Sequence, residues 1–154
     1  MKYINSSICC FLLLGAFSVN ASAQSWMKQD NPDSLGLYVR VSDDCPITKE
    51  ELTKRIEGEF LRARIKPTRS LSLNITVEVL CLSIAQGSSN TVRGHAVNYG
   101  IRFGATMEVN HFLYDGPNHG SLLIVPKGSN QYLLDAIRDS VSNALTDYLK
   151  ANFG

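Results

Sequence analysis

The feature that most constrains the fold is a pair of cysteines, Cys45 and Cys81, each of which follows a stretch of alternating apolar residues. Residues 35–41 alternate before the first cysteine, and residues 71–81 alternate up to the second. Alternation with a period of two is typical of a half-buried strand. A helix is predicted between them, and such a strand–helix–strand unit joins two parallel strands by a right-handed crossover. The two cysteines then lie at the same end of neighbouring strands, where one disulfide can join them.

The helix between these strands is predicted over residues 49–64. Thr48 and Glu51 have the spacing of a capping box, in which each side chain accepts a hydrogen bond from the other residue's backbone amide. The apolar residues recur at helical spacing and predict one buried stripe: Leu52, Ile56, Phe60 and Ala63.

The first 23 residues have the organisation of a secretory signal peptide. Lys2 precedes an apolar run over residues 8–19, and Ala21 and Ala23 form a small-x-small cleavage pattern. Removal of this segment takes away Cys9 and Cys10, which leaves only the pair above. A periplasmic or secreted location, in a Gram-negative bacterium, is therefore expected, with an oxidised cysteine pair.

After the signal peptide, residues 24–34 are predicted to form a flexible polar leader, and residues 35–154 one domain. Further strands are expected at about 91–104, 107–114 and 121–125, followed by a last helix. The fold class is α+β: a two-layer sandwich of order β-α-β-β-β(-β)-α. It places two helices on one face of a four- to five-stranded mixed sheet and leaves the other face open.

This order of elements resembles that of small envelope domains of Gram-negative bacteria, such as the amino-terminal domain of TolB and the lipopolysaccharide-assembly lipoprotein. The resemblance is one of topology, without a shared motif, and it implies assembly or binding rather than catalysis. The lipoprotein also carries a lipid anchor, whereas this chain has no acylation cysteine after its apolar run.

The charge of the chain argues against nucleic acid as the partner. Fifteen basic and 14 acidic residues give a net charge of +1, and loss of Lys2 with the signal peptide reduces it to about zero. Binding to phosphates normally needs a clear basic excess.

Few residues have a pattern that suggests catalysis. The chain contains no G-x-S-x-G nucleophile motif and no phosphate-binding glycine loop, and no cofactor or metal is predicted. His111, Asp115 and His119 could together serve a small metal-dependent hydrolase, but their spacing is not a known ligand pattern. Like His95, they are also explained as isolated residues on strands and in a turn.

Two surfaces are candidates for binding. The first is the open sheet face with the turn at 115–120, where glycines alternate along the third strand and the candidate contacts are Asn98, Arg102, Glu108, Asp115, Asn118 and His119. The second is a basic cluster near the end of the first helix that could bind an anion: Arg62, Arg64, Lys66 and Arg69.

The sequence thus predicts a non-enzymatic binding or envelope-assembly accessory protein that docks a protein partner through its open sheet face or loops. The alternative is an inhibitor or immunity protein that blocks a hydrolase by inserting the 115–120 loop. The metal-dependent hydrolase is the third hypothesis.

Overall fold

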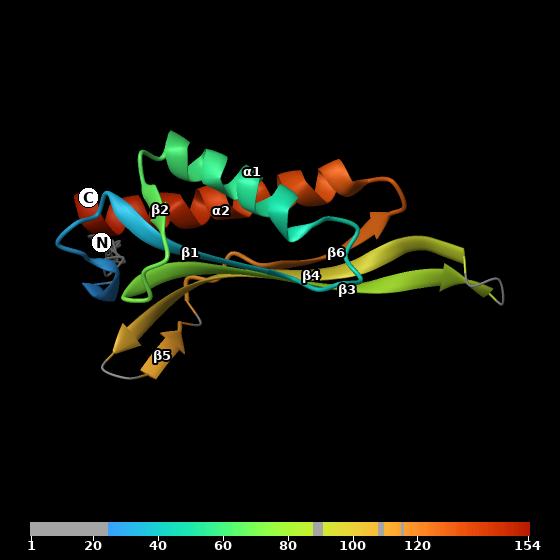
Figure 1. Cartoon of the computed structure of the whole chain (residues 1–154), viewed down its shortest axis with the longest axis horizontal. Helices are drawn as coiled ribbons and strands as arrows, with labels where there is room; N and C mark the ends of the chain where they lie inside the picture. The colour runs from blue at the N-terminus through green and yellow to red at the C-terminus, as the bar shows by residue number, and fades with distance from the viewer. Residues whose placement is uncertain (1–24, 88–90, 108–109, 115) are drawn as a thin grey trace, which may run out of the picture.

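Two helices lie across one face of a mixed sheet in the computed structural model, which describes residues 25–87, 91–107, 110–114 and 116–154 (Figure 1). The elements are η1 (Ser25–Met27), β1 (Ser34–Val41), α1 (Lys49–Arg62), β2 (Lys66–Thr68), β3 (Leu73–Gln86), β4 (Thr91–Met107), β5 (Asn110–Leu113), β6 (Ser121–Pro126) and α2 (Asn130–Phe153). The predicted α+β class, with both helices on one side and one disulfide, is confirmed. Neither helix among the described residues is long and apolar enough to cross a membrane.

The sheet has six strands within the described ranges, in the order β2-β1-β3-β4-β5, and β6 also pairs with β4. β1 and β3 are parallel neighbours, as the crossover rule predicted, with Leu37 opposite Ile75. β2 was not among the strands predicted from the sequence. It pairs in parallel with the start of β1, and its three residues are too few to show an alternating pattern.

The start of α1 forms the predicted capping box. The Glu51 amide donates to Thr48 Oγ1 at 3.2 Å, and the Thr48 amide donates to Glu51 Oε2 at 2.9 Å. These hydrogen bonds from the Thr48 backbone and hydroxyl lower the pKa of Glu51 because they favour its charged form. The helix ends at Arg62, two residues earlier than expected, and Arg64 has a φ of 57°, which a continuing helix cannot contain.

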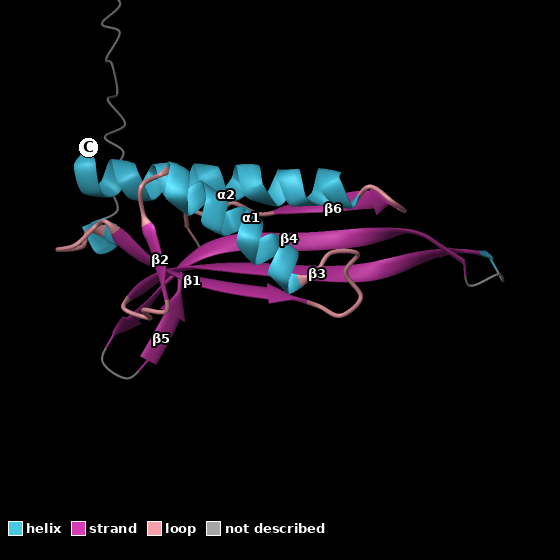
Figure 2. Cartoon of the chain, turned by 45° about the horizontal axis from the view of Figure 1, so that its top comes forward, coloured by secondary structure: helices cyan, strands magenta, loops and turns pink. Residues whose placement is uncertain are grey.

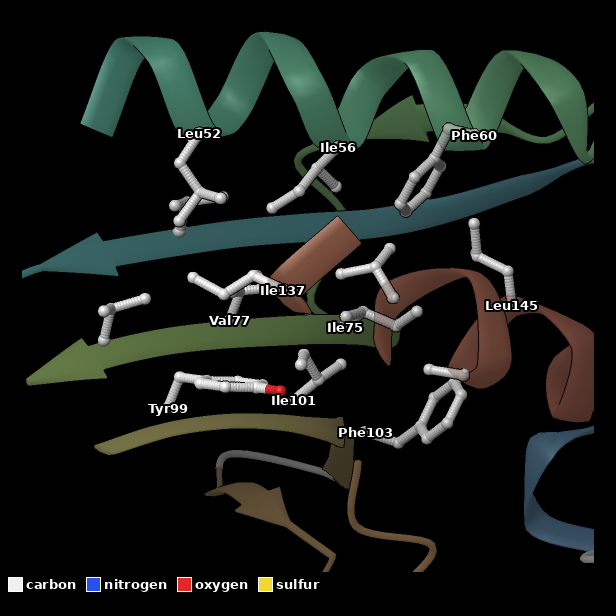
Figure 3. Packing of buried hydrophobic residues seen from close by; sticks show 14 of the residues in the cluster. Leu52, Ile56, Phe60, Ile75, Val77, Tyr99, Ile101, Phe103, Ile137 and Leu145 are labelled. Atoms are coloured by element: carbon white, nitrogen blue, oxygen red, sulfur yellow. The ribbon is translucent and has the colours of Figure 1, made fainter. Parts of the chain in front are cut away.

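The core lies between the helices and the sheet (Figure 3). Leu52, Ile56 and Phe60 of α1 point down toward β1 and β3, where they meet Ile75 and Val77. The next strand and the second helix add Tyr99, Ile101, Phe103, Ile137 and Leu145. All of these side chains are buried, so the face of the sheet that carries them is fully covered.

The predicted disulfide between Cys45 and Cys81 is present, with the two Cα atoms 5.0 Å apart. That distance lies within the usual range for a bridged pair. The bridge joins the segment after β1 to β3, so the parallel pairing of these strands and the disulfide support each other.

Residues 25–34 pack against the domain, in contrast to the flexible leader that their polar composition predicts. Met27 is buried, and Trp26 stacks on Tyr114 with ring centroids 3.9 Å apart. Asn152 of α2 donates to the Met27 carbonyl at 3.0 Å and accepts from the Gln29 amide at 2.9 Å. The packing of Trp26 and Met27 and the two hydrogen bonds of the Asn152 side chain thus hold this otherwise polar segment against the domain.

Candidate functional site

The open face of the sheet has a shallow hollow at its centre, on the side opposite the helices. Its volume is about 280 Å³, and its lining includes Thr76, Glu78, Leu80, Asn98, Gly100, Arg102, Leu113, Asn118 and Leu122. Gly100 makes the hollow possible. A side chain at this position would meet only the Arg102 guanidinium, 3.9 Å from its first carbon.

Charged groups surround Gly100 without neutralising one another directly. Glu78 lies opposite Gly100 on β3, and Arg102 lies two residues further along β4. Among the described residues neither Glu78 nor Arg102 has an ion-pair partner. Within the described ranges, the hollow therefore presents one positive and one negative group that are not paired.

Toward the β3–β4 turn the same face becomes apolar. Three cross-strand rows follow one another: Leu80–Asn98–Leu122, Leu82–Ala96–Ile124 and Ile84–Gly94–Pro126. The large apolar side chains of these rows are exposed, at 52% for Leu80, 71% for Leu82, 38% for Ile84, 71% for Leu122 and 63% for Ile124. We call this surface, with its floor of Gly94 and Ala96, the apolar trough.

The sequence contains a signal for the trough that the prediction did not use. Along β3 the buried apolar residues are odd-numbered up to Cys81, and polar residues such as Thr76 and Glu78 occupy the opposite face. At positions 80, 82 and 84 the even-numbered residues are apolar instead, while the odd-numbered Ser83 lies on the helix side. This change of phase marks the point where the apolar face of the strand switches sides.

The structure describes only some of the candidate contacts predicted from the sequence, and it brings three of them together. Asn98, Arg102 and Asn118 are brought together around the hollow. Glu108 and Asp115 lie outside the described residues. These positions remain candidates for contact with a partner.

His119 does not face the hollow with its imidazole. Its Nε2 lies 3.0 Å from Asp147 Oδ2 of α2, within ion-pairing distance but not aligned as a hydrogen bond. Its amide donates to the Ile101 carbonyl at 3.2 Å, and a side chain at Gly120 would collide with the Tyr99 carbonyl. His119 and Gly120, the last two residues of this turn, therefore lie against β4.

Of the residues proposed for a hydrolase, only the His119 side chain lies in the described part of the chain, since Asp115 is outside it. His95 lies on β4 between Ser83 and Val125, far along the strand from the turn that carries His119. His111 lies on β5, and its side chain is outside the described set. No group of three potential metal ligands gathers among the described residues.

The basic cluster spreads over the end of α1 and the edge strand β2. Arg62 is paired with Glu59 of its own helix. Lys66 lies at the start of β2, and the Arg69 carbonyl accepts a hydrogen bond from the Tyr38 hydroxyl at 2.5 Å. One member of the cluster is thus already paired within its own helix, and the cluster stays a candidate for anion binding.

Comparison with known proteins gives only distant similarities. No family model matches this chain, and no curated protein is similar to it in sequence. Among solved structures, it is similar to rare lipoprotein B from Shewanella oneidensis at 10% identity and a TM-score of 0.33, over 75% of this chain and 92% of that one. A putative neuraminyllactose-binding hemagglutinin homologue from Helicobacter pylori matches at 10% identity and a TM-score of 0.38, over 80% and 84% of the two chains. A minor lipoprotein from Acinetobacter baumannii matches at 8% identity and a TM-score of 0.32, over 78% and 90%. Similarities at these TM-scores carry no argument about function.

Proposed function

We propose that this chain is a non-enzymatic binding protein of the cell envelope that docks a protein partner through the open face of its sheet. The observation that supports this function is the apolar trough, where five large apolar side chains on an uncovered face are 38–71% exposed. Soluble monomers rarely leave such a contiguous apolar surface in water, and the ones that do generally use it for interaction.

The arrangement around the trough suits a protein partner. Interfaces of this kind have an apolar centre and a polar rim. The trough supplies the centre, and the hollow with Glu78, Asn98 and Arg102 supplies polar and charged groups at one end. The nearly neutral charge of the chain gives no general attraction to nucleic acid.

The proposed location rests on the cysteines and the amino terminus. A disulfide that joins Cys45 to Cys81 is expected to persist in an oxidising compartment. The signal-like first 23 residues are consistent with export to the periplasm or the exterior.

The test is a crosslinked pull-down with the full chain from the envelope fraction of the cells that produce it. The wild type should capture a defined protein, and the double variant Leu82→Asp/Ile124→Asp should lose it because two carboxylates would be buried in the contact. Leu61→Asp is the matched control, since Leu61 is 75% exposed on α1, away from the trough. Equal capture by the wild type and the double variant would show that the open face is not the docking surface.

A further inference from the structure

We infer that the occupant of the apolar trough is an amphipathic helix of the partner protein. This inference rests on the proposed function and goes further, because it specifies the secondary structure and the chemistry of the segment that binds.

The cross-section of the trough fits a cylinder. β3 and β6 flank β4, so their apolar side chains form two ridges about 10 Å apart, given the spacing of about 4.8 Å between neighbouring strands. Between the ridges the floor is low, because it consists of Ala96 and Gly94. A helix with its side chains is about 10–12 Å across, and the apolar stripe of one can enter the space between two such ridges.

The spacing along the trough also fits a helix. Successive rows are two residues apart on each strand, which is about 7 Å. Residues i and i+4 of a helix are about 6 Å apart along its axis, so a helix that lies along the strands can place one side chain between each pair of rows. The same strands already carry a helix on their other face, where α2 lies along β4 and β6 (Figure 2).

Two other occupants fit less well. A single acyl chain is narrower than the distance between the ridges, so it would leave much of the exposed area of Leu82 and Leu122, both 71% exposed, in water. A second copy of this chain would place one trough over another, which leaves an empty space between the two low floors. A convex helix would cover the ridges and also fill the space above the floor.

The charges near the trough indicate the polar flanks of that helix. Arg93 lies on β4 next to Gly94, and Lys127 follows β6, with its amide bonded to the Arg93 carbonyl at 2.8 Å. The described stretches 80–86, 91–98 and 121–126 contain no acidic residue. At the other end the hollow contains both Arg102 and Glu78, so the basic excess lies at the end near Arg93 and Lys127. The complementary helix therefore has an apolar stripe bordered by acidic residues at that end.

The experiment is site-specific photocrosslinking in the cells that produce the protein. The full chain carries p-benzoylphenylalanine in place of Leu82 or Ile124, with the same group in place of Leu61 as the control. Mass spectrometry identifies the crosslinked segment. We expect a peptide of another protein with apolar residues every three to four positions and acidic residues beside them, attached at both trough positions and absent at position 61.

A synthetic peptide of that segment then supplies the quantitative test with the mature protein. It should gain helical circular dichroism on binding. Leu82→Asp should weaken its binding at least 30-fold, and Leu61→Asp should change it by less than twofold.

The other outcomes separate the failure of this inference from that of the proposed function. A crosslinked segment from another protein with alternating apolar residues would overturn the helix and leave partner docking intact. A segment of this chain itself, a lipid adduct, or no adduct at either trough position would overturn both.

Discussion

The two halves of β3 have similar composition and opposite environments. In the first half, Leu73, Ile75, Val77 and Val79 lie under the helices and are almost fully buried. In the second half, Leu80, Leu82 and Ile84 point away from the helices, and the strand continues with β4 beyond the ends of both helices (Figure 1). The comparison shows that apolar residues of one strand can either form the core or form an exposed apolar surface, depending on the face of the sheet on which they lie.

Cys81 is the last buried residue along β3, and it lies next to Leu80, the first residue of the exposed apolar series. The disulfide therefore lies at the boundary between the two halves. The double variant Cys45→Ala/Cys81→Ala should lose about 4 kcal/mol of unfolding free energy, because the bridge closes a long loop in the unfolded chain. Urea denaturation followed by circular dichroism measures this loss. A loss below about 1 kcal/mol would mean that strand pairing alone fixes the boundary.

Matched leucines test the comparison directly. Leu73→Ala should destabilise the protein by about 3 kcal/mol, because it leaves a cavity in the covered core. Leu82→Ala, on the same strand but in the trough, should change the stability by only about 0.5 kcal/mol. Thermal unfolding of the two variants measures both. Similar losses at the two positions would show that the trough is part of the folding core rather than a contact surface.

Much of this comparison was available from the sequence. Alternation predicted β1 and β3, and the crossover rule predicted that they are parallel neighbours whose cysteines lie at the same end. The change from odd-numbered to even-numbered apolar residues at Leu80 predicts the trough as well, since it is visible in the sequence of residues 73–84. The sequence could not show that β6 pairs with β4, because that register depends on contacts between segments far apart in the chain.

The sequence placed Asn98, Arg102 and Asn118 in one candidate surface, but it could not show that they line a single hollow. That arrangement depends on the pairing of β4 with β6, which brings Asn118 and Leu122 to the face of β4 that carries Asn98 and Arg102. The side chain of His119 looked equally suited to that site, but the contact with Asp147 directs it toward α2. A contact between a turn and a helix leaves no periodic pattern in the sequence.

The covered side contains a buried polar contact that should respond to pH. The Tyr148 hydroxyl donates to the Pro32 carbonyl at 3.0 Å, and burial, with a contribution from the charge of Asp33, raises its pKa to about 12 from an ordinary value of 10.0. The folded state thus favours the neutral phenol. This contribution is complete below about pH 10 and is lost as the pH rises toward 12.

Tyr148→Phe should remove the alkaline loss of stability. At neutral pH it should lower the unfolding free energy by about 1.5 kcal/mol, because the Pro32 carbonyl and the Gln29 side-chain amide each lose a hydrogen-bond partner. Urea denaturation between pH 8 and pH 12 measures both effects. Tyr132→Phe, at an exposed position of the same helix, is the control for stability at neutral pH. An unchanged alkaline slope in the Tyr148 variant would assign the loss to another group.

The smallest effect concerns two glycines on the open face. A first side-chain carbon at Gly94 would lie 2.6 Å from the Val125 carbonyl oxygen, whereas one at Gly100 would make only an ordinary contact with Arg102 Nε at 3.9 Å. Gly100→Ala should therefore stabilise the protein by about 0.5 kcal/mol, because it reduces the freedom of the unfolded chain. Gly94→Ala should destabilise it, because β4 and β6 must separate. Differential scanning calorimetry distinguishes the two signs. A destabilising Gly100→Ala would mean that the hollow is already filled by groups of the chain itself, and the open face would then lack the free polar end that the docking proposal assigns to it.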